Sequence, residues 1–325
     1  MFFQHRTVLS LAVAQALMAP SSFAQSLDAT IVGCAEADCP TAGRSTSSEC
    51  QLVDKNLSMI GLARVPVESD TLEGLSWVEG VAIADSNDGN RAFDKSFYLG
   101  TPPSLSLNDT GACALFFTHV STRVKFEDDD TDVSVSQGTC EDAMSKECVS
   151  ALTSRAEDLD VDGLSSKEAC KKLQEEFEDN LDSECSSFAD GSKWVGLETT
   201  ALSGVEPISS KENSSSECWP ITPKAYDLSF VRSFETEGDY LADTLANEFY
   251  GIVPILTFFF PRDSHKIVSK AEAQMTCMKT IDSSVASNST KSSGSEDEDN
   301  AGETLIISGH VVVSFFVAAS LFLLV

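Results

Sequence analysis

Three aspartates alternate with other residues in the acidic run 158–163, which ends in a glycine. Alternating carboxylates before a turn glycine are typical of loops that bind calcium through several oxygens. The twelfth position of such a loop should carry a bidentate carboxylate, but here it is Ala169, and Glu168 falls one residue early. We therefore interpret this run as an acidic turn between helices, and keep as weak candidate metal ligands Asp158, Asp160 and Asp162.

A second motif with catalytic potential is Asp109-Thr110-Gly111, which matches the catalytic triplet of pepsin-like proteases. That chemistry needs two carboxylates sharing a proton, and the chain has no second Asp-Thr-Gly or Asp-Ser-Gly. Serine-hydrolase elbows, phosphate-binding loops, dinucleotide fingerprints and zinc-protease motifs do not occur either. The two carboxylates of a glycoside hydrolase leave no short motif, so that class of enzyme stays open. The catalytic residues are thus unknown, and we predict no cofactor.

Charge narrows the range of partners. The chain has 325 residues, 42% of them hydrophobic, which allows one or two domains with a buried core. Its 22 basic residues face 51 acidic ones, for a net charge of −29. Such a charge repels phosphate backbones and excludes nucleic acid as a partner. Any charged partner should be cationic, such as a basic protein, and wall glycans are the uncharged candidates.

Both ends of the chain carry processing signals. Residues 1–24 combine a basic start, a short apolar run and small residues, which predicts a secretory signal peptide cut after Ala24. Residues 311–325 form an apolar tail without a basic residue, preceded by a spacer and by the small residues 300–302. This pattern predicts glycosylphosphatidylinositol (GPI) attachment at Asn300 and removal of residues 301–325.

Alternatives at this end are Gly294 or Ser293 as the attachment residue, and a retained transmembrane helix over 305–325. Residues 282–300 are Ser-rich and acidic, which is typical of an extended stalk that cannot pack. With either form of attachment, the expected location is the outer face of the plasma membrane or the cell wall, and the GPI lipid would sit in the outer leaflet.

All ten cysteines lie between the two removable ends, and their even number predicts five disulfides. We expect Cys148–Cys170 and Cys140–Cys185 to form nested links across a helical hairpin, because the members of each pair lie at similar distances from its turn. Four triplets are acceptors for N-linked glycans, and each predicts a surface position: Asn56, Asn108, Asn213 and Asn288.

Hydrophobic periodicity predicts a mixed fold. Short strands are expected over 58–65, 76–83, 93–99, 114–120 and 123–127, and again over 194–202, 226–234, 253–260 and 273–281. Within the last of these but one, the run Leu256-Thr-Phe-Phe-Phe260 lacks alternation, which indicates a strand buried on both faces. The alternative is an exposed binding edge. Two amphipathic helices are expected within 141–185, and Ser165 with Glu168 forms a capping box for the second. We predict an α+β fold over residues 25–281: a single disulfide-braced domain of two β-rich segments around an acidic two-helix hairpin.

Four stretches together carry a resemblance to a family: Ser96-Phe-Tyr-Leu-Gly-Thr-Pro-Pro103, Gly111-Ala-Cys-Ala-Leu-Phe-Phe117, Gln137-Gly-Thr-Cys-Glu-Asp-Ala-Met144 with Cys148, and Ser216-Glu-Cys-Trp-Pro-Ile-Thr-Pro223. Over most of the ectodomain the chain resembles the uncharacterised GPI-anchored surface proteins of filamentous ascomycete fungi. The resemblance implies a fungal cell surface and carries over no active-site residue. The function we expect is that of a non-enzymatic surface glycoprotein with a structural or adhesive role. The alternative is a surface-anchored glycoside hydrolase acting on wall polysaccharide, with a cleft lined by Trp77, Trp194 or Trp219.

Overall fold

The computed structural model describes the parts of the chain that lie within one compact unit: residues 31–34, 37, 39, 50–85, 91–120, 122–127, 132–214, 216, 218–239, 241–262 and 267–282. Outside these residues lie the predicted signal peptide, nearly all of the stalk, Asn288, Asn300 and the tail 301–325. Among the described helices, none has the length and apolar character needed to cross a bilayer.

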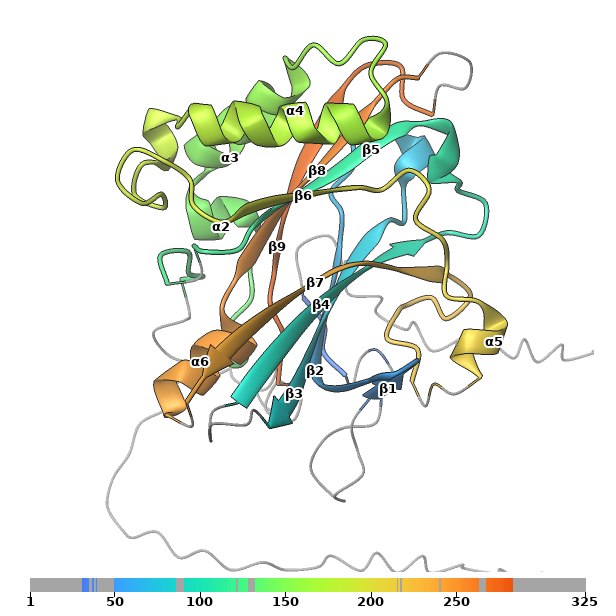
Figure 1. Cartoon of the computed structure of the whole chain (residues 1–325), viewed down its shortest axis with the longest axis vertical. Coiled ribbons are helices and arrows are strands. Elements are labelled where there is room, and N and C mark those ends of the chain that lie inside the picture. Colours follow the sequence, from blue (N-terminus) through green and yellow to red (C-terminus); the bar gives the residue numbers. More distant parts are fainter. Residues whose placement is uncertain are drawn as a thin grey trace, which may run out of the picture. The chain divides into compact units, whose positions relative to one another are not determined.

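Two antiparallel sheets form the centre of the fold (Figure 1). The first sheet has the order β1-β2-β3-β4-β7, with β1 (Cys50–Leu52), β2 (Lys55–Arg64), β3 (Ser76–Asp85), β4 (Arg91–Thr101) and β7 (Asp227–Gly238). The second sheet has the order β6-β5-β8-β9, with β6 (Leu197–Ala201), β5 (Gly111–Phe117), β8 (Val253–Phe260) and β9 (Glu272–Met278). Each sheet therefore combines strands from both halves of the chain.

Helices cover the second sheet. Helix α3 (Lys146–Glu157) packs against β8 and β9, and α4 (Ser166–Asp179) packs against β5 and β6, as Figure 1 shows. The remaining helical segments are short: α2 (Cys140–Met144), α5 (Ser210–Asn213), α6 (Ala242–Tyr250), and the 3-10 turns η1 (Asp70–Leu72), η2 (Leu107–Asp109) and η3 (Ser183–Cys185).

The second sheet is buried on both faces, and β5 shows how. Phe116 makes edge-to-face contact with Trp77 of the first sheet, at 5.7 Å between ring centroids. Its neighbour Phe117 points the other way and meets Phe177 of α4 at 6.2 Å. Because successive strand residues face opposite sides, this alternation places the sheet between two apolar layers. All eight residues of β8 are likewise buried, which confirms the prediction for that strand.

The mixed helix and sheet content confirms the α+β class in broad terms. The capping box of α4 is confirmed as well, because the Glu168 N–H donates to Ser165 Oγ and the Glu168 carboxylate accepts the Ser165 N–H. The segment 123–127 is not a strand, however. Strands from both β-rich segments lie in each sheet, because β7 joins the first sheet and β5 the second.

The outer face of the first sheet carries a second, smaller core. The N-terminal segment reaches it through Val32, which pairs with Leu62 of β2. Cys50 and Cys218 form a disulfide there, linking β1 to the segment before β7. Cys34 and Cys39 are also buried in this core.

The disulfide pairing differs from the one expected from the sequence. Cys140 is bonded to Cys277 of β9 rather than to Cys185, and Cys148 is bonded to Cys185 rather than to Cys170. Cys170 pairs instead with Cys113 of β5. The expected pairing placed the cysteines between two helices that face each other. Both helices turn their apolar sides to the second sheet, so α4 is bonded to that sheet and α3 to the segment that follows α4.

Candidate functional site: an acidic groove between two helices

A groove of about 1020 Å³ lies between α3, α4 and the return segment that follows α4. Its wall carries six carboxylates, from Glu147, Asp158, Asp160, Glu176, Asp182 and Glu184. Three cationic side chains line it as well, from Lys146, Arg155 and Lys172. Six negative against three positive groups make this groove acidic.

The ends of the two helices are fixed by local hydrogen bonds. Ser145 caps α3, since its Oγ accepts the Cys148 N–H at 3.3 Å. Ser165 caps α4 through the reciprocal bonds with Glu168, whose carboxylate also accepts the Ser165 hydroxyl at 2.7 Å. These hydrogen bonds, first from the Ser165 side chain and then from its backbone, lower the pKa of Glu168. The groove is therefore bordered by two helices in which a capping side chain binds a backbone N–H group of the first turn.

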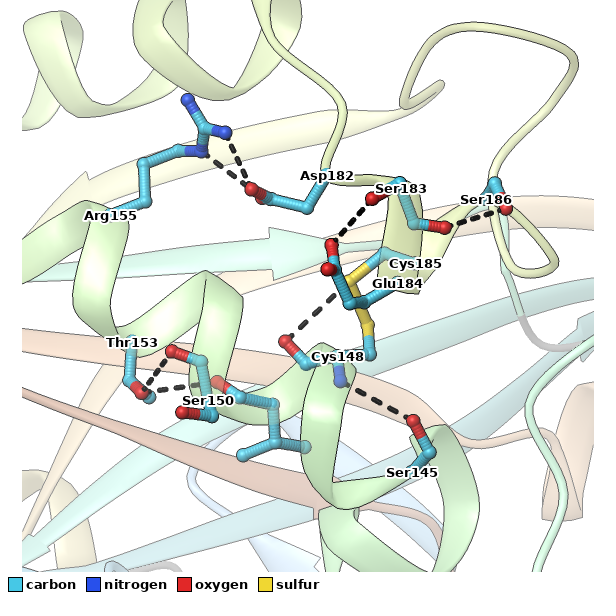
Figure 2. Close-up of a disulfide and its surroundings, with 11 residues drawn as sticks. Ser145, Cys148, Ser150, Thr153, Arg155, Asp182, Ser183, Glu184, Cys185 and Ser186 are labelled. Atoms are coloured by element: carbon cyan, nitrogen blue, oxygen red, sulfur yellow. Dashed lines mark hydrogen bonds and ion pairs between the residues drawn. A yellow bond between two sulfur atoms is a disulfide. The ribbon is translucent and has the colours of Figure 1, made fainter.

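Arg155 joins the two walls of the groove. Its Nε and Nη2 donate to the two carboxylate oxygens of Asp182 at 3.1 and 2.5 Å, and Nη1 donates to Glu176 at 2.9 Å. Figure 2 shows the bidentate contact with Asp182. The hydrogen bond to Asp182, followed by that to Glu176, raises the pKa of Arg155. Bidentate geometry of this kind gives a fixed orientation as well as attraction, so α3, α4 and the return segment are held together here.

The disulfide Cys148–Cys185 fastens the same return segment to α3 (Figure 2). Both cysteines are buried. Glu184, next to Cys185, is exposed and accepts a hydrogen bond from Ser183 at 2.9 Å. The disulfide therefore fixes the segment that carries Glu184 to helix α3.

Of the three candidate metal ligands, Asp158 and Asp160 line the groove, whereas Asp162 lines a separate hollow with Ser165 and Glu168, and the three are not arranged as a calcium site. Asp160 Oδ1 accepts the backbone N–H of Asp162 at 3.3 Å, and the Lys172 ammonium donates to the Asp160 carbonyl. Glu168 is adjacent to the twelfth position of the loop, but its carboxylate already accepts hydrogen bonds from the backbone N–H and the hydroxyl of Ser165. Among the described residues the sulfurs of Cys39, Cys50 and Cys218 do lie within 4.8 Å of one another, but two of them form a disulfide.

Addition of millimolar calcium is expected to leave the melting temperature of the protein unchanged. A ligand that binds only the folded state must raise that temperature, whereas the loop has no carboxylate at its twelfth position and Glu168 is engaged in the helix cap. Thermal unfolding with and without calcium measures this directly, with magnesium as the control. A rise of several degrees that Asp160→Ala abolishes would contradict the expectation.

The tryptophans proposed for a sugar-binding cleft lie elsewhere. Trp77 is buried between the sheets and donates its indole N–H to Thr257 at 3.0 Å. Trp194 is buried against Phe117, at 4.9 Å between ring centroids. Neither ring presents a face to a sugar in solution. Trp219 is half-buried, and its indole N–H donates to the Tyr226 carbonyl at 3.1 Å.

Thr110 of the protease-like triplet has a structural role. Thr110 is completely buried and donates its hydroxyl to the Phe260 carbonyl at 3.0 Å, so it serves the packing of η2 against β8. The acceptors Asn56 and Asn108 are exposed, and Asn213 is half-buried. Glycan attachment at these positions remains a prediction.

One carboxyl that the sequence did not single out lies in the interior. Glu79 of β3 is completely buried, in the strand that the sequence predicted over 76–83. Burial raises its pKa to about 7, against the opposing influence of Lys95 and Lys279. The sequence did not indicate that this residue is buried, because a single acidic residue in a strand usually faces solvent.

Comparison of the chain with family models, with curated proteins and with solved structures yields no match.

Proposed function

We propose that this chain is a GPI-anchored glycoprotein of a fungal cell surface that acts by binding, through its acidic groove, rather than by catalysis. In this proposal residues 25–281 form a single disulfide-braced ectodomain, and residues 282–300 form a stalk that holds it away from the membrane. The observation that carries the binding role is the groove itself: six carboxylates on a frame fixed by Arg155 and by the Cys148–Cys185 bond.

The negative charge of the groove favours a cationic partner. The carboxylates of the groove add locally to a chain with a net charge of −29. A field of one sign attracts the opposite charge and speeds its encounter with the site. A fixed groove also avoids part of the entropy lost when flexible side chains are ordered on binding. A lysine- or arginine-rich segment of another surface protein is the chemistry that fits.

A lysine-rich peptide is expected to bind the ectodomain less tightly when groove carboxylates are neutralised. The variant Glu147→Gln, Asp158→Asn, Glu184→Gln removes three exposed charges that make no ion pair with Arg155. At about 0.5 kcal/mol for each exposed charge contact, the dissociation constant should rise about tenfold. Calorimetric titration at low and at physiological salt measures the change.

The matched control removes the same number of exposed charges elsewhere, by Glu73→Gln, Glu235→Gln and Glu237→Gln. It reduces the net negative charge by the same amount and should leave the peptide affinity nearly unchanged. Equal weakening in both variants would show that net charge alone attracts the peptide, and the groove proposal would then fail.

The alternative function, a glycoside hydrolase, is tested by incubating the protein with wall glucans, chitin and mannan. Sustained release of reducing ends that is lost when one carboxylate is removed would make the protein a hydrolase.

The anchor has its own test. Phosphatidylinositol-specific phospholipase C is expected to release the protein from membranes, because the enzyme cleaves the lipid that GPI attachment adds. Mass spectrometry of the released form should find a C-terminus at or near Asn300. Mature protein that still ends in Val325 would instead support the retained transmembrane helix over 305–325.

A further inference from the structure

The buried carboxyl of Glu79 stands among charged side chains at one end of the space between the sheets. It is 0% exposed, and neither of its oxygens has a hydrogen-bond partner among the described residues. The two cations that act on it are Lys95 of β4 and Lys279, which follows β9. A buried ionisable group without a partner is costly, so this arrangement calls for an explanation.

Lys95 is the nearer of these cations along the sheet. Residue 81 of β3 pairs directly with Lys95, and Glu79 lies two residues away on the same face. Diagonal neighbours of this kind are within reach of long side chains. Lys279 has other partners, since its ammonium donates to the Val133 carbonyl at 2.6 Å and to Ser136 Oγ at 2.5 Å.

The Lys95 ammonium meets a carboxylate from helix α6. Its Nζ lies 3.6 Å from Oε2 of Glu248, and the two side chains are only 9% and 14% exposed. The same Glu248 oxygen accepts a hydrogen bond from Thr236 of β7 at 2.7 Å. Figure 1 shows α6 beside the end of β7, and the hydrogen bond between Thr236 and Glu248 joins these two elements. An amine, a carboxyl held by a hydroxyl, and a buried proton acceptor therefore come together from β4, α6 and β3.

We propose that Lys95 and Glu248 condense into an intramolecular isopeptide bond, with Glu79 as the group that moves the proton. The Glu79 carboxylate takes a proton from the Lys95 ammonium, and the free amine attacks Cδ of Glu248. Glu79 then returns the proton to the departing oxygen of Glu248, which leaves as water with the second proton of the nitrogen. One C–N bond forms and one C–O bond breaks, so an ammonium and a carboxylate become an amide and one water, without any redox partner.

The setting favours this condensation in three ways. Burial removes the hydration that stabilises an ion pair in water, and the neutral amide does not need it. Holding the two groups in contact replaces an encounter in solution by an intramolecular reaction. Glu79, with a pKa of about 7, can both accept and return a proton near neutrality. The new amide N–H would also provide a donor near the unpartnered Glu79 carboxyl.

Peptide mapping of the full-length protein tests the bond. After reduction and digestion, we expect a branched peptide that contains Lys95 and Glu248 and is lighter by one water than the sum of its two parts. Glu79→Gln keeps the shape of the side chain but removes the proton acceptor, and it should abolish the branched peptide. Recovery of the two peptides separately and unmodified from the folded wild-type protein would overturn the proposal.

A second variant keeps the outcome clear if Glu79→Gln fails to fold. Glu248→Gln should yield the same branched peptide, because an amide side chain loses ammonia where the acid loses water. Lys95→Arg keeps the positive charge beside Glu248 but lacks a reactive amine, and it should give no branch. A branched peptide that persists in Lys95→Arg would mean that another lysine is the nucleophile, which also overturns the assignment.

Discussion

Replacing Cys140 and Cys277 together by serine is expected to lower the free energy of unfolding by up to about 5 kcal/mol. The bond joins the start of α2 to β9, across 137 positions of the chain. A cross-link over so long a loop removes much conformational freedom from the unfolded chain, and its loss restores that freedom. Denaturant unfolding of the oxidised variant and of the wild-type protein measures the difference.

The matched control is the pair Cys148→Ser and Cys185→Ser, which opens a link across only 37 positions. The same chain-entropy model gives about 4 kcal/mol for this bond. Non-reducing peptide mapping of the wild-type protein should first join Cys140 to Cys277 and Cys148 to Cys185. Peptides that instead join Cys140 to Cys185 and Cys148 to Cys170 would restore the pairing expected from the sequence and contradict the structure.

The stability of the protein is expected to fall by about 3 kcal/mol between pH 4.5 and neutral pH because of Glu79 alone. Burial raises the pKa of this group from its ordinary value of 4.5 to about 7. Between these two values the folded state keeps a proton that the unfolded state has already released. Unfolding then releases a proton, so rising pH favours the unfolded state across this window. Above pH 7 the full cost of the buried carboxylate is present.

The measurement compares the pH dependence of unfolding in the wild-type protein and in Glu79→Gln. The variant cannot ionise at this position, so its stability should fall less over the window, by about 3 kcal/mol. The comparison uses the difference between the two slopes, because a change in packing caused by the substitution does not vary with pH. Glu73→Gln, at an exposed position, is the control. Parallel curves for the wild type and Glu79→Gln would mean that the group has an ordinary pKa.

Local features of this chain were predictable because they depend on residues close in sequence. The cap formed by Ser165 and Glu168 lies where the spacing placed it, since both partners belong to the same helical turn. The lack of alternation in residues 256–260 of β8 indicated burial on both faces, and helix α4 presents its apolar side as the periodicity predicted. The Asp158–Asp162 run lies in the turn between helices, where the sequence also placed it.

Features that join distant segments were not predictable in the same way. The expected disulfides assumed that two neighbouring helices face each other, whereas both pack on a sheet whose strands come from residues 111 to 278. Helix α6 was missed, although it brings Glu248 to Lys95. The groove was also not foreseen as a site, because its frame depends on the contact of Arg155 with Asp182, 27 positions away.

The sequence by itself therefore determined the α+β class, the start of α4 set by its capping box, the buried central strand and the excess of negative charge. Only the tertiary structure decided which cysteines pair, which acidic residues share a groove, and that Glu79 lies in the core beside Lys95 and Lys279. The physical reason is the range of the interactions. Capping and periodicity act within one or two turns, whereas cross-links, ion pairs and the burial of a charge depend on which surfaces the packing of two sheets and a helical layer brings together.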